Sequence, residues 1–206
     1  MNEQLEKVAE ALRKRGFTVV CCATGDEARA YVMKEAGTAR SVGFGGSVTV
    51  KSLGLVEAME AAGKEILRHG DPSLTPERKA EVMRRELTCD LFLLSANALT
   101  LDGRLVNIDG NGNRVAASIY GPGTVVFVVG RNKIVDGGID AAIDRIKRAA
   151  CPPNCRRLNK KTPCAATGAC ADCSSPDRIC SVTVVMDRRP SRTDAHVLLV
   201  DEDLGY

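Results

Sequence analysis

Aromatic residues are scarce in this chain of 206 residues: four phenylalanines, three tyrosines and no tryptophan make up 3% of it. With so few rings, the chain has no stacking surface for single-stranded nucleic acid. Charge of one sign is not in excess either, because 29 basic residues stand against 26 acidic ones. A strongly basic face for a phosphate backbone is therefore not expected. These two absences argue against nucleic acid as a partner.

Long apolar runs are also absent. The first ten residues, Met-Asn-Glu-Gln-Leu-Glu-Lys-Val-Ala-Glu, are charged from the third position and contain no apolar core of a signal peptide. No later run approaches the ~20 apolar residues that a membrane-spanning helix needs. We expect a cytoplasmic protein without a membrane span.

Histidine occurs only twice, at His69 and His196. Neither residue lies in a motif for metal binding or for activation of a nucleophile, so we interpret His69 as a turn residue and His196 as a strand-edge residue. This pattern argues against a hydrolase with a serine, histidine and carboxylate triad.

The chain alternates between amphipathic and short apolar segments, the rhythm of βαβ units. Helices are predicted over residues 2–15, 25–35, 47–62, 75–87 and 139–149, and strands over residues 17–22, 41–44, 64–68, 91–94, 115–119, 125–129, 181–186 and 196–200. This order predicts one α/β domain over residues 1–206 with a mostly parallel sheet.

A glycine-rich turn follows the second predicted strand, in the sequence Gly43-Phe44-Gly45-Gly46-Ser47-Val48-Thr49. Exposed amide groups at the start of the following helix would favour a phosphate or a carboxylate. The motif is neither a dinucleotide fingerprint nor a P-loop. The alternative is a plain tight turn with Ser47 as a helix cap. The candidate ligand-binding residues here are Gly45, Gly46, Ser47 and Thr49.

The stretch from Ser95 to Asp136 concentrates polar residues in the loops between apolar runs. Asp109 could abstract a proton while Arg114 and Lys133 stabilise an enolate, or the three could hold a polar ligand. We therefore predict Asp109 and Lys133 as catalytic residues. The further candidate ligand-binding residues in this stretch are Asn97, Gly110, Asn113 and Arg114.

Some of these polar residues are explained as turn formers, because Asp102-Gly103 and Asp109-Gly110 are common hairpin dipeptides. The loops follow strands near the middle of a parallel sheet, so their ends should converge on the edge where the glycine-rich turn lies. We expect Gly46 and Asp109 to be neighbours across a cleft.

Nine cysteines are an odd number, and six of them fall between Cys151 and Cys180. A secreted disulfide scaffold explains this distribution poorly. The segment has only two large aliphatic residues, Leu158 and Ile179, so it cannot order itself by apolar burial alone. We predict a cysteine-rich loop insert over residues 151–180 that is ordered by a metal, either zinc or an iron–sulfur cluster. Core cysteines without a metal are the alternative.

The predicted metal ligands include the Cys-x2-Cys pair and the cysteines on either side of it: Cys164, Cys170, Cys173 and Cys180. Cys155 could replace one of the four. Cys151 is the weakest candidate, because Pro152-Pro153 stiffens its approach to a shared metal.

Four segments resemble, in the same order along the chain, the sequences of the LUD-domain, or lactate-utilisation, family. They are residues 43–49, 95–100, 103–116 and 121–135. The resemblance covers nearly the whole chain. It implies a three-layer α/β/α sandwich, the fold shared by ribose-5-phosphate isomerases, glucosamine-6-phosphate deaminases and CoA transferases. Members of the family act with iron–sulfur proteins in the oxidation of L-lactate to pyruvate. Many of them lack a cysteine-rich insert of this kind, so the insert departs from the simplest family pattern.

Three functions follow from the resemblance and the residues. The first is a ligand-binding or catalytic subunit that supports oxidation of L-lactate or a related organic acid. The second is an electron-transfer or assembly subunit built on a metal cluster. The third is a sugar-phosphate or CoA-ester enzyme of the same fold. CoA transferases of this fold use a glutamate nucleophile, and none occurs between Ser95 and Asp136. Candidate partners are a small anionic metabolite, iron–sulfur oxidoreductase subunits and a second copy of the chain.

Overall fold

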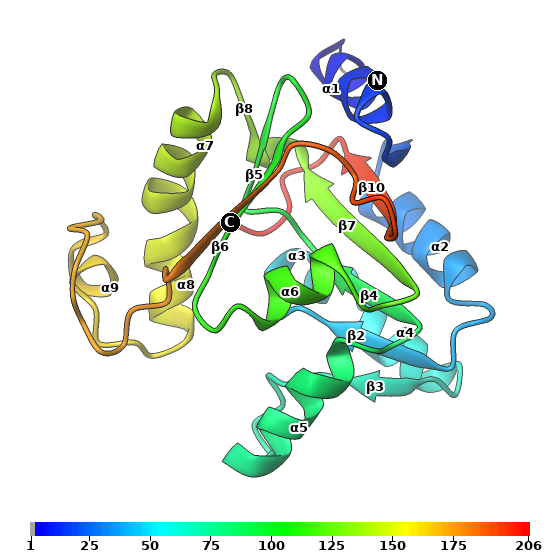
Figure 1. Ribbon diagram of the computed structural model, residues 1–206, viewed down its shortest axis with the longest axis horizontal. Coiled ribbons are helices and arrows are strands. Elements are labelled where there is room, and N and C mark those ends of the chain that lie inside the picture. The colour runs from blue at the N-terminus through cyan, green and yellow to red at the C-terminus, as the bar shows by residue number, and fades with distance from the viewer. Residues whose placement is uncertain (1–2) are drawn as a thin grey trace.

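A six-stranded parallel sheet forms the centre of the computed structural model, which describes residues 3–206 (Figure 1). The spatial order of the strands is β1 (Thr18–Cys22), β10 (Asp194–Val200), β7 (Thr124–Gly130), β4 (Leu91–Leu94), β2 (Ser41–Phe44) and β3 (Glu65–Leu67). Every neighbouring pair is parallel. The predicted α/β fold with a mostly parallel sheet is confirmed.

A second sheet has four strands in the order β8 (Ile134–Val135), β5 (Ala98–Thr100), β6 (Leu105–Asp109) and β9 (Val182–Met186). β5 and β6 form an antiparallel hairpin around the predicted turn at Asp102-Gly103. β9 pairs antiparallel with β6, so the strand expected over residues 181–186 joins this second sheet and not the central one.

Nine α-helices are described. They are α1 (Glu3–Lys14), α2 (Gly25–Glu35), α3 (Val48–Ser52), α4 (Leu55–Ala61), α5 (Pro76–Glu86), α6 (Asn113–Ile119), α7 (Ile139–Arg145), α8 (Cys151–Arg157) and α9 (Pro163–Thr167). A 3-10 turn, Arg131–Lys133, follows β7, and a π-helical turn, Ile146–Ala150, joins α7 to α8. The expected start of the first helix at residue 2 lies outside the described residues.

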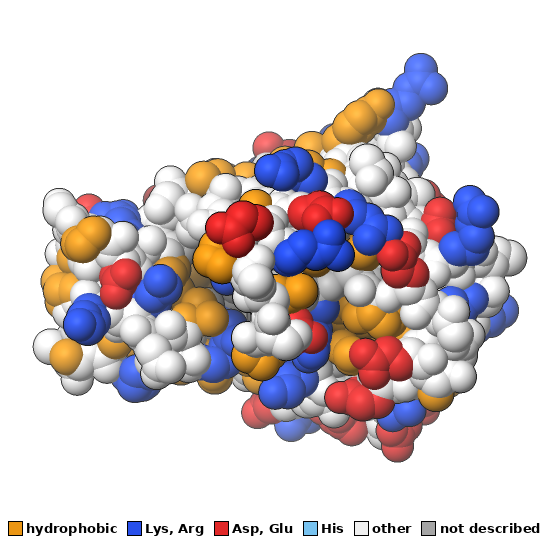
Figure 2. Space-filling view, turned by 90° about the horizontal axis from the view of Figure 1, so that it is seen from below, with side chains coloured by type: hydrophobic (Ala, Val, Ile, Leu, Met, Phe, Trp, Pro, Cys, Tyr) orange, Lys and Arg blue, Asp and Glu red, His pale blue; other side chains and the backbone are white. Residues whose placement is uncertain are grey.

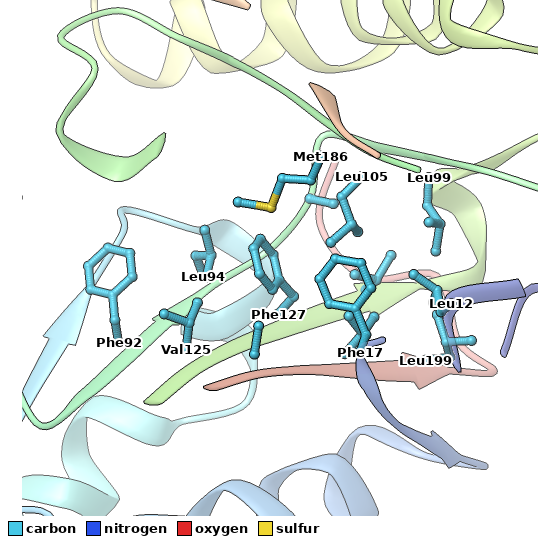
Figure 3. Packing of buried hydrophobic residues seen from close by; sticks show 14 of the residues in the cluster. Leu12, Phe17, Phe92, Leu94, Leu99, Leu105, Val125, Phe127, Met186 and Leu199 are labelled. Atoms are coloured by element: carbon cyan, nitrogen blue, oxygen red, sulfur yellow. The ribbon is translucent and has the colours of Figure 1, made fainter. Parts of the chain in front are cut away.

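The apolar cores lie on both faces of the central sheet. α2, α3 and α4 pack Val32, Val50 and Met59 against one face. On the other face, α1 and the second sheet meet the central strands, and Leu105 and Met186 point toward Phe127 of β7 (Figure 3). α7 covers the outer side of the second sheet. The three layers of the predicted sandwich are the helices on one face, the central sheet, and the helices with the second sheet on the other face.

Two predicted elements were wrong, and a third differs in detail. Residues 115–119 are not a strand but the end of α6, because a short apolar run cannot be told from a buried helix by its pattern alone. The helix expected over residues 47–62 is two helices, since Gly54 has a φ of 60° and breaks it. The insert is less loop-rich than expected. Pro152 and Pro153 stand in the first turn of α8, where proline is tolerated.

No helix within residues 3–206 combines the length and the apolar character needed to cross a membrane.

Candidate functional site

Four adjacent parallel strands deliver loops to one edge of the central sheet. β2 ends before Gly45, β4 ends before Ser95, and β7 leads through the 3-10 turn to Lys133. β3, at the end of the sheet, ends two residues before His69. Because parallel strands all present their carboxyl ends at the same edge, side chains from distant parts of the sequence meet there.

A cavity of about 60 Å³, which we call the inner cavity, lies at this edge. Seven of the predicted residues line it: Gly45, Gly46, Ser47, Thr49, Asn97, Arg114 and Lys133. Ser95, Asn154 and Tyr206 also line it and were not predicted. One probe-sized water needs roughly 10–15 Å³, so the inner cavity has room for on the order of four to six water-sized groups.

Lys133 is the most unusual residue of the inner cavity. Its side chain is only 4% exposed, and its ammonium donates to Thr49 Oγ1 at 2.7 Å and to Ser95 Oγ at 2.8 Å. Both hydroxyls donate their own hydrogens to carbonyl oxygens, those of Leu204 and Ala96. An ammonium has three N–H donors, so one donor of Lys133 remains for a ligand.

Burial, together with the nearby positive charges of Arg145 and Arg114, lowers the pKa of Lys133 to about 7. No aspartate or glutamate is among the described residues that line the inner cavity. A buried cation that is repelled by two nearby cations is stabilised by an anion. The chemistry of the inner cavity therefore suits a negatively charged group.

Arg114 is held by the protein on several sides. Its guanidinium donates to Asn107 Oδ1 at 2.9 Å, to Asn97 Oδ1 at 3.0 Å and to the Ile108 carbonyl oxygen at 2.9 Å. Its Nε lies 3.6 Å from Asp109 Oδ1. Arg114 and Asn97 therefore build the wall of the inner cavity, and most of their hydrogen-bonding capacity is already used.

A larger cavity of about 420 Å³, the outer cleft, adjoins the inner cavity across Gly45, Gly46 and Arg114, which line both. Gly46 and Asp109 line this cleft together, as the strand order led us to expect. The predicted residues Gly110 and Asn113 also line it. Asp109 and Lys133 therefore face different spaces, so the two predicted catalytic residues do not share one cavity.

Basic side chains surround the outer cleft. Among the described residues, its lining includes five cations, Lys79, Arg114, Arg157, Lys160 and Arg178, and two carboxylates, Asp109 and Asp177. Two of these cations pair with carboxylates of the cysteine-rich segment, Lys160 with Asp177 and Arg178 with Asp172. Figure 2 shows lysine and arginine side chains between the α9 end of the molecule, at the left, and the larger body.

The backbone of the glycine-rich turn lies close to neighbouring side chains, which is possible because glycine has no side chain of its own. A Cβ atom at Gly45 would lie 3.0 Å from Arg114 Cγ and 3.1 Å from Leu94 Cβ. Gly46 has a φ of 68°, a left-handed conformation that favours glycine. Ser47 caps α3 by accepting from the Val50 amide at 3.3 Å. Since α3 has only five residues, its dipole is weaker than that of the long helix expected here.

The cysteine-rich segment gathers thiols in a different grouping from the predicted one. Cys151, Cys155 and Cys164 are buried, whereas Cys170, Cys173 and Cys180 are half-buried. Cys155 Sγ lies 3.7 Å from Cys164 Sγ. Burial raises the pKa of Cys151 to about 12, and the charges of Cys180, Cys155, Cys164 and Cys170 act in the same direction.

Cys155 and Cys164, which we call the thiol pair, have the spacing of two ligands of one metal ion. The sulfurs of a tetrahedral metal site with bonds of about 2.3 Å lie about 3.8 Å apart, which the Cys155–Cys164 separation of 3.7 Å matches. In the described chain, however, no group of three or more cysteine, histidine or acidic side chains is arranged to hold a metal ion. The structure thus brings one predicted ligand, Cys164, to the substitute ligand Cys155, and does not bring the four predicted ligands together.

Sequence reasoning missed one residue pair at this edge. His69, interpreted as a turn residue, places Nδ1 2.8 Å from Glu86 Oε1 and 2.9 Å from Oε2 and lines the outer cleft. Glu86 stands 17 positions later, at the end of α5, and no local motif joins the two. Only the packing of α5 beside β3 makes the pair.

Comparison with known proteins agrees with this architecture. The chain is similar to a DUF162 family protein from Deinococcus radiodurans known from its crystal structure, with a TM-score of 0.56, 16% sequence identity and 96% coverage of each chain. At this identity the likeness concerns the fold alone. No curated protein matches the chain. The model of the LUD domain matches residues 5–200. The chain therefore belongs to the LUD-domain family.

Proposed function

We propose that the inner cavity binds the carboxylate of a small organic acid, and that the protein is a ligand-binding or catalytic subunit in the oxidation of L-lactate or a related acid. The observation that carries this proposal is the buried Lys133, which has a free donor and no aspartate or glutamate among the described residues of the inner cavity. Membership of the LUD-domain family supports the organic acid as the ligand class and iron–sulfur proteins as the partners.

The size of the inner cavity favours a small acid over the larger ligands of the shared fold. About 60 Å³ accommodates a carboxylate and a few further atoms, as in lactate, whereas a sugar phosphate or a CoA ester would have to extend into the outer cleft. Among the described residues that line the outer cleft, no glutamate could serve as the nucleophile of a CoA transferase. Glu86 lies beside this cleft, but its side chain is fully buried and forms a hydrogen bond with His69.

The proposal predicts that binding depends on the negative charge of the ligand. We expect L-lactate to bind at least tenfold more tightly than its neutral amide, because a hydrogen bond from a buried ammonium to a carboxylate contributes roughly 1.5–3 kcal/mol. Isothermal titration calorimetry of the full chain with both compounds measures the difference. Equal affinity for the acid and the amide, or binding of neither, would contradict the proposal.

The thiol pair supports a second candidate, a metal centre in the cysteine-rich segment that takes part in electron transfer or assembly. Cys155, Cys164 and Cys180, with Cys170 and Cys173 on the neighbouring loop, would supply the thiolates, and the metal would be zinc or an iron–sulfur cluster. Such a centre would order a segment that has few large aliphatic side chains.

This candidate predicts that Cys155→Ser with Cys164→Ser removes bound metal from anaerobically purified protein and makes residues 151–180 sensitive to protease. The predicted pair Cys170→Ser with Cys173→Ser should act in the same way, while Cys21→Ser, far from the segment in sequence, should retain the metal. Elemental analysis and limited proteolysis measure both effects. If the wild-type protein contains neither zinc nor iron, or if both double variants retain full metal content, the metal centre is wrong.

A further inference from the structure

A third cavity, of about 200 Å³, lies beside the glycine-rich turn, and the proposed function does not use it. We call it the apolar pocket. At roughly 10–15 Å³ for each water-sized group, it has room for on the order of ten to twenty such groups. Its apolar walls come from β2, β4, α3 and α4, and they consist of Phe44, Leu93, Val48, Val50 and Val56.

Most of these walls belong to the hydrophobic core. Leu93 is fully buried, and Phe44, Val50 and Val56 are between 2% and 7% exposed. All four lie in the core cluster between the central sheet and the helices α2 to α4. A polar group in such surroundings loses its hydrogen bonds to water without replacing them, whereas a hydrocarbon group is stabilised by leaving water. The ligand that suits this part of the pocket is therefore a hydrocarbon chain.

Cations lie at the mouth of the apolar pocket. Lys51 and Arg157 are exposed, Arg68 is half-buried, and no aspartate or glutamate is among the described residues that line the pocket. Arg68 pairs with Asp71 at 3.1 Å. Arg157 instead donates from Nε and Nη2 to a neutral oxygen, Asn154 Oδ1, at 3.1 Å and 2.7 Å. The mouth therefore suits a negatively charged head group.

We propose that the apolar pocket binds a medium-chain carboxylic acid, with the hydrocarbon chain among the core residues and the carboxylate at Lys51 and Arg157. The apolar walls and the cations line the same cavity, so one ligand meets both. Octanoate, with about ten non-hydrogen atoms, fits the available volume. This site is separate from the one at Lys133, which lines the inner cavity and not the apolar pocket. The inference does not depend on the proposed function.

The inference predicts that affinity rises with the length of the chain. Each methylene that leaves water strengthens binding roughly fourfold, so we expect octanoate to bind at least about thirtyfold more tightly than butanoate. The exposed cations at the mouth contribute less, and octanoate should bind about threefold more tightly than neutral octanamide. Isothermal titration calorimetry of the full chain measures both ratios. Equal affinity of octanoate for either comparison compound would overturn the proposal.

Two variants locate the bound chain and the head group. Val56→Phe should fill part of the pocket and weaken octanoate binding at least about tenfold, because a cavity that is already occupied cannot take up the chain. Arg157→Gln should weaken it about threefold. As a matched control, Arg156→Gln changes the exposed neighbour on α8, which does not line the pocket, and should bind octanoate as the wild type does.

Lys133→Met separates this inference from the proposed function. We expect this variant to bind octanoate with wild-type affinity, because Lys133 does not line the apolar pocket. If Lys133→Met weakened octanoate and L-lactate equally, octanoate would occupy the inner cavity, and this inference would be wrong while the proposed function stands. If the wild type bound octanoate but not L-lactate, the inference would be supported and the proposed function contradicted.

The position of the chain can also be measured in the wild-type protein, which keeps the test valid if Val56→Phe does not fold. We expect intermolecular NOEs between the methylenes of octanoate and both the Phe44 ring and the Val56 methyl groups. Bound octanoate without these NOEs, or octanoate binding to Val56→Phe with wild-type affinity, would place the chain elsewhere and overturn the proposal. Failure of the wild type to bind octanoate at all would overturn it as well.

Discussion

Lys133→Met is expected to weaken the binding of small carboxylates about thirtyfold or more while leaving the protein folded. Methionine has a similar length and keeps the cavity filled, but it has no charge and no donor. The loss should be about 2 kcal/mol or more, or roughly thirtyfold in affinity, because the contact is charge-assisted and buried. Calorimetric titration with L-lactate, together with circular dichroism, measures binding and folding separately.

Lys7→Met provides the matched control. Lys7 is 70% exposed and pairs with Glu3 on α1, so its removal should leave carboxylate binding unchanged. If Lys133→Met lost folding stability and binding in equal measure, Lys133 would be a structural residue. If it bound L-lactate as the wild type does, the inner cavity would not be the carboxylate site.

The pH dependence of binding follows from the lowered pKa of Lys133. With a pKa of about 7 in the free protein, the ammonium loses its proton as the pH rises through neutrality. Only the charged form attracts the carboxylate, so affinity for L-lactate should fall above pH 7 and approach a tenfold loss per pH unit. Between this pKa and the ordinary lysine value the unfolded chain binds more protons, so this residue makes stability rise with pH in that range.

Arg114→Leu is expected to have the largest effect on stability. The substitution leaves Asp109, which is 14% exposed, without its cation, and removes one hydrogen bond each from Asn107 Oδ1, Asn97 Oδ1 and the Ile108 carbonyl oxygen. Removing one partner of a buried ion pair costs about 3–5 kcal/mol. Urea denaturation measures the change in the free energy of unfolding.

An exposed arginine gives the comparison. Arg131 is 48% exposed and pairs with Asp201 and Asp203, so Arg131→Leu should cost less than about 1 kcal/mol. If Arg114→Leu were as mild as Arg131→Leu, the hydrogen bonds of Arg114 would contribute little to the fold. We would then assign Arg114 to the ligand, as its sequence context had suggested.

The central sheet was predictable because its strands are short, fully apolar runs. Leu91–Leu94 and Thr124–Gly130 carry almost no polar side chains and alternate with helical segments, which is typical of strands buried on both faces. The run at 115–119 has similar apolar content but folds as part of α6. Its Ala and Ser residues suit either state, so tertiary packing decides there.

The site was predictable where its residues directly follow strands of the parallel sheet. It was not predictable where the contact depends on how a helix packs beside a loop. The glycine-rich turn and Lys133 follow strands, so the strand order alone brings them together. His69 and Glu86 lie on different elements, and neither stands in a motif, so only the packing of α5 shows their contact. The network of Arg114 could not be foreseen either, because side-chain acceptors such as Asn107 carry no sequence signal of their partner.

The central claim is that the buried ammonium of Lys133 binds the carboxylate of the ligand. Measurement of the pKa of Lys133 tests this claim most directly. NMR of protein labelled at the lysine Cε atoms, assigned with Lys133→Met, measures the pKa with and without L-lactate. We expect a pKa of about 7 in the free protein and a clear increase when L-lactate is bound, because an anion stabilises the charged form. An ordinary lysine pKa in the free protein that L-lactate does not change would contradict the account.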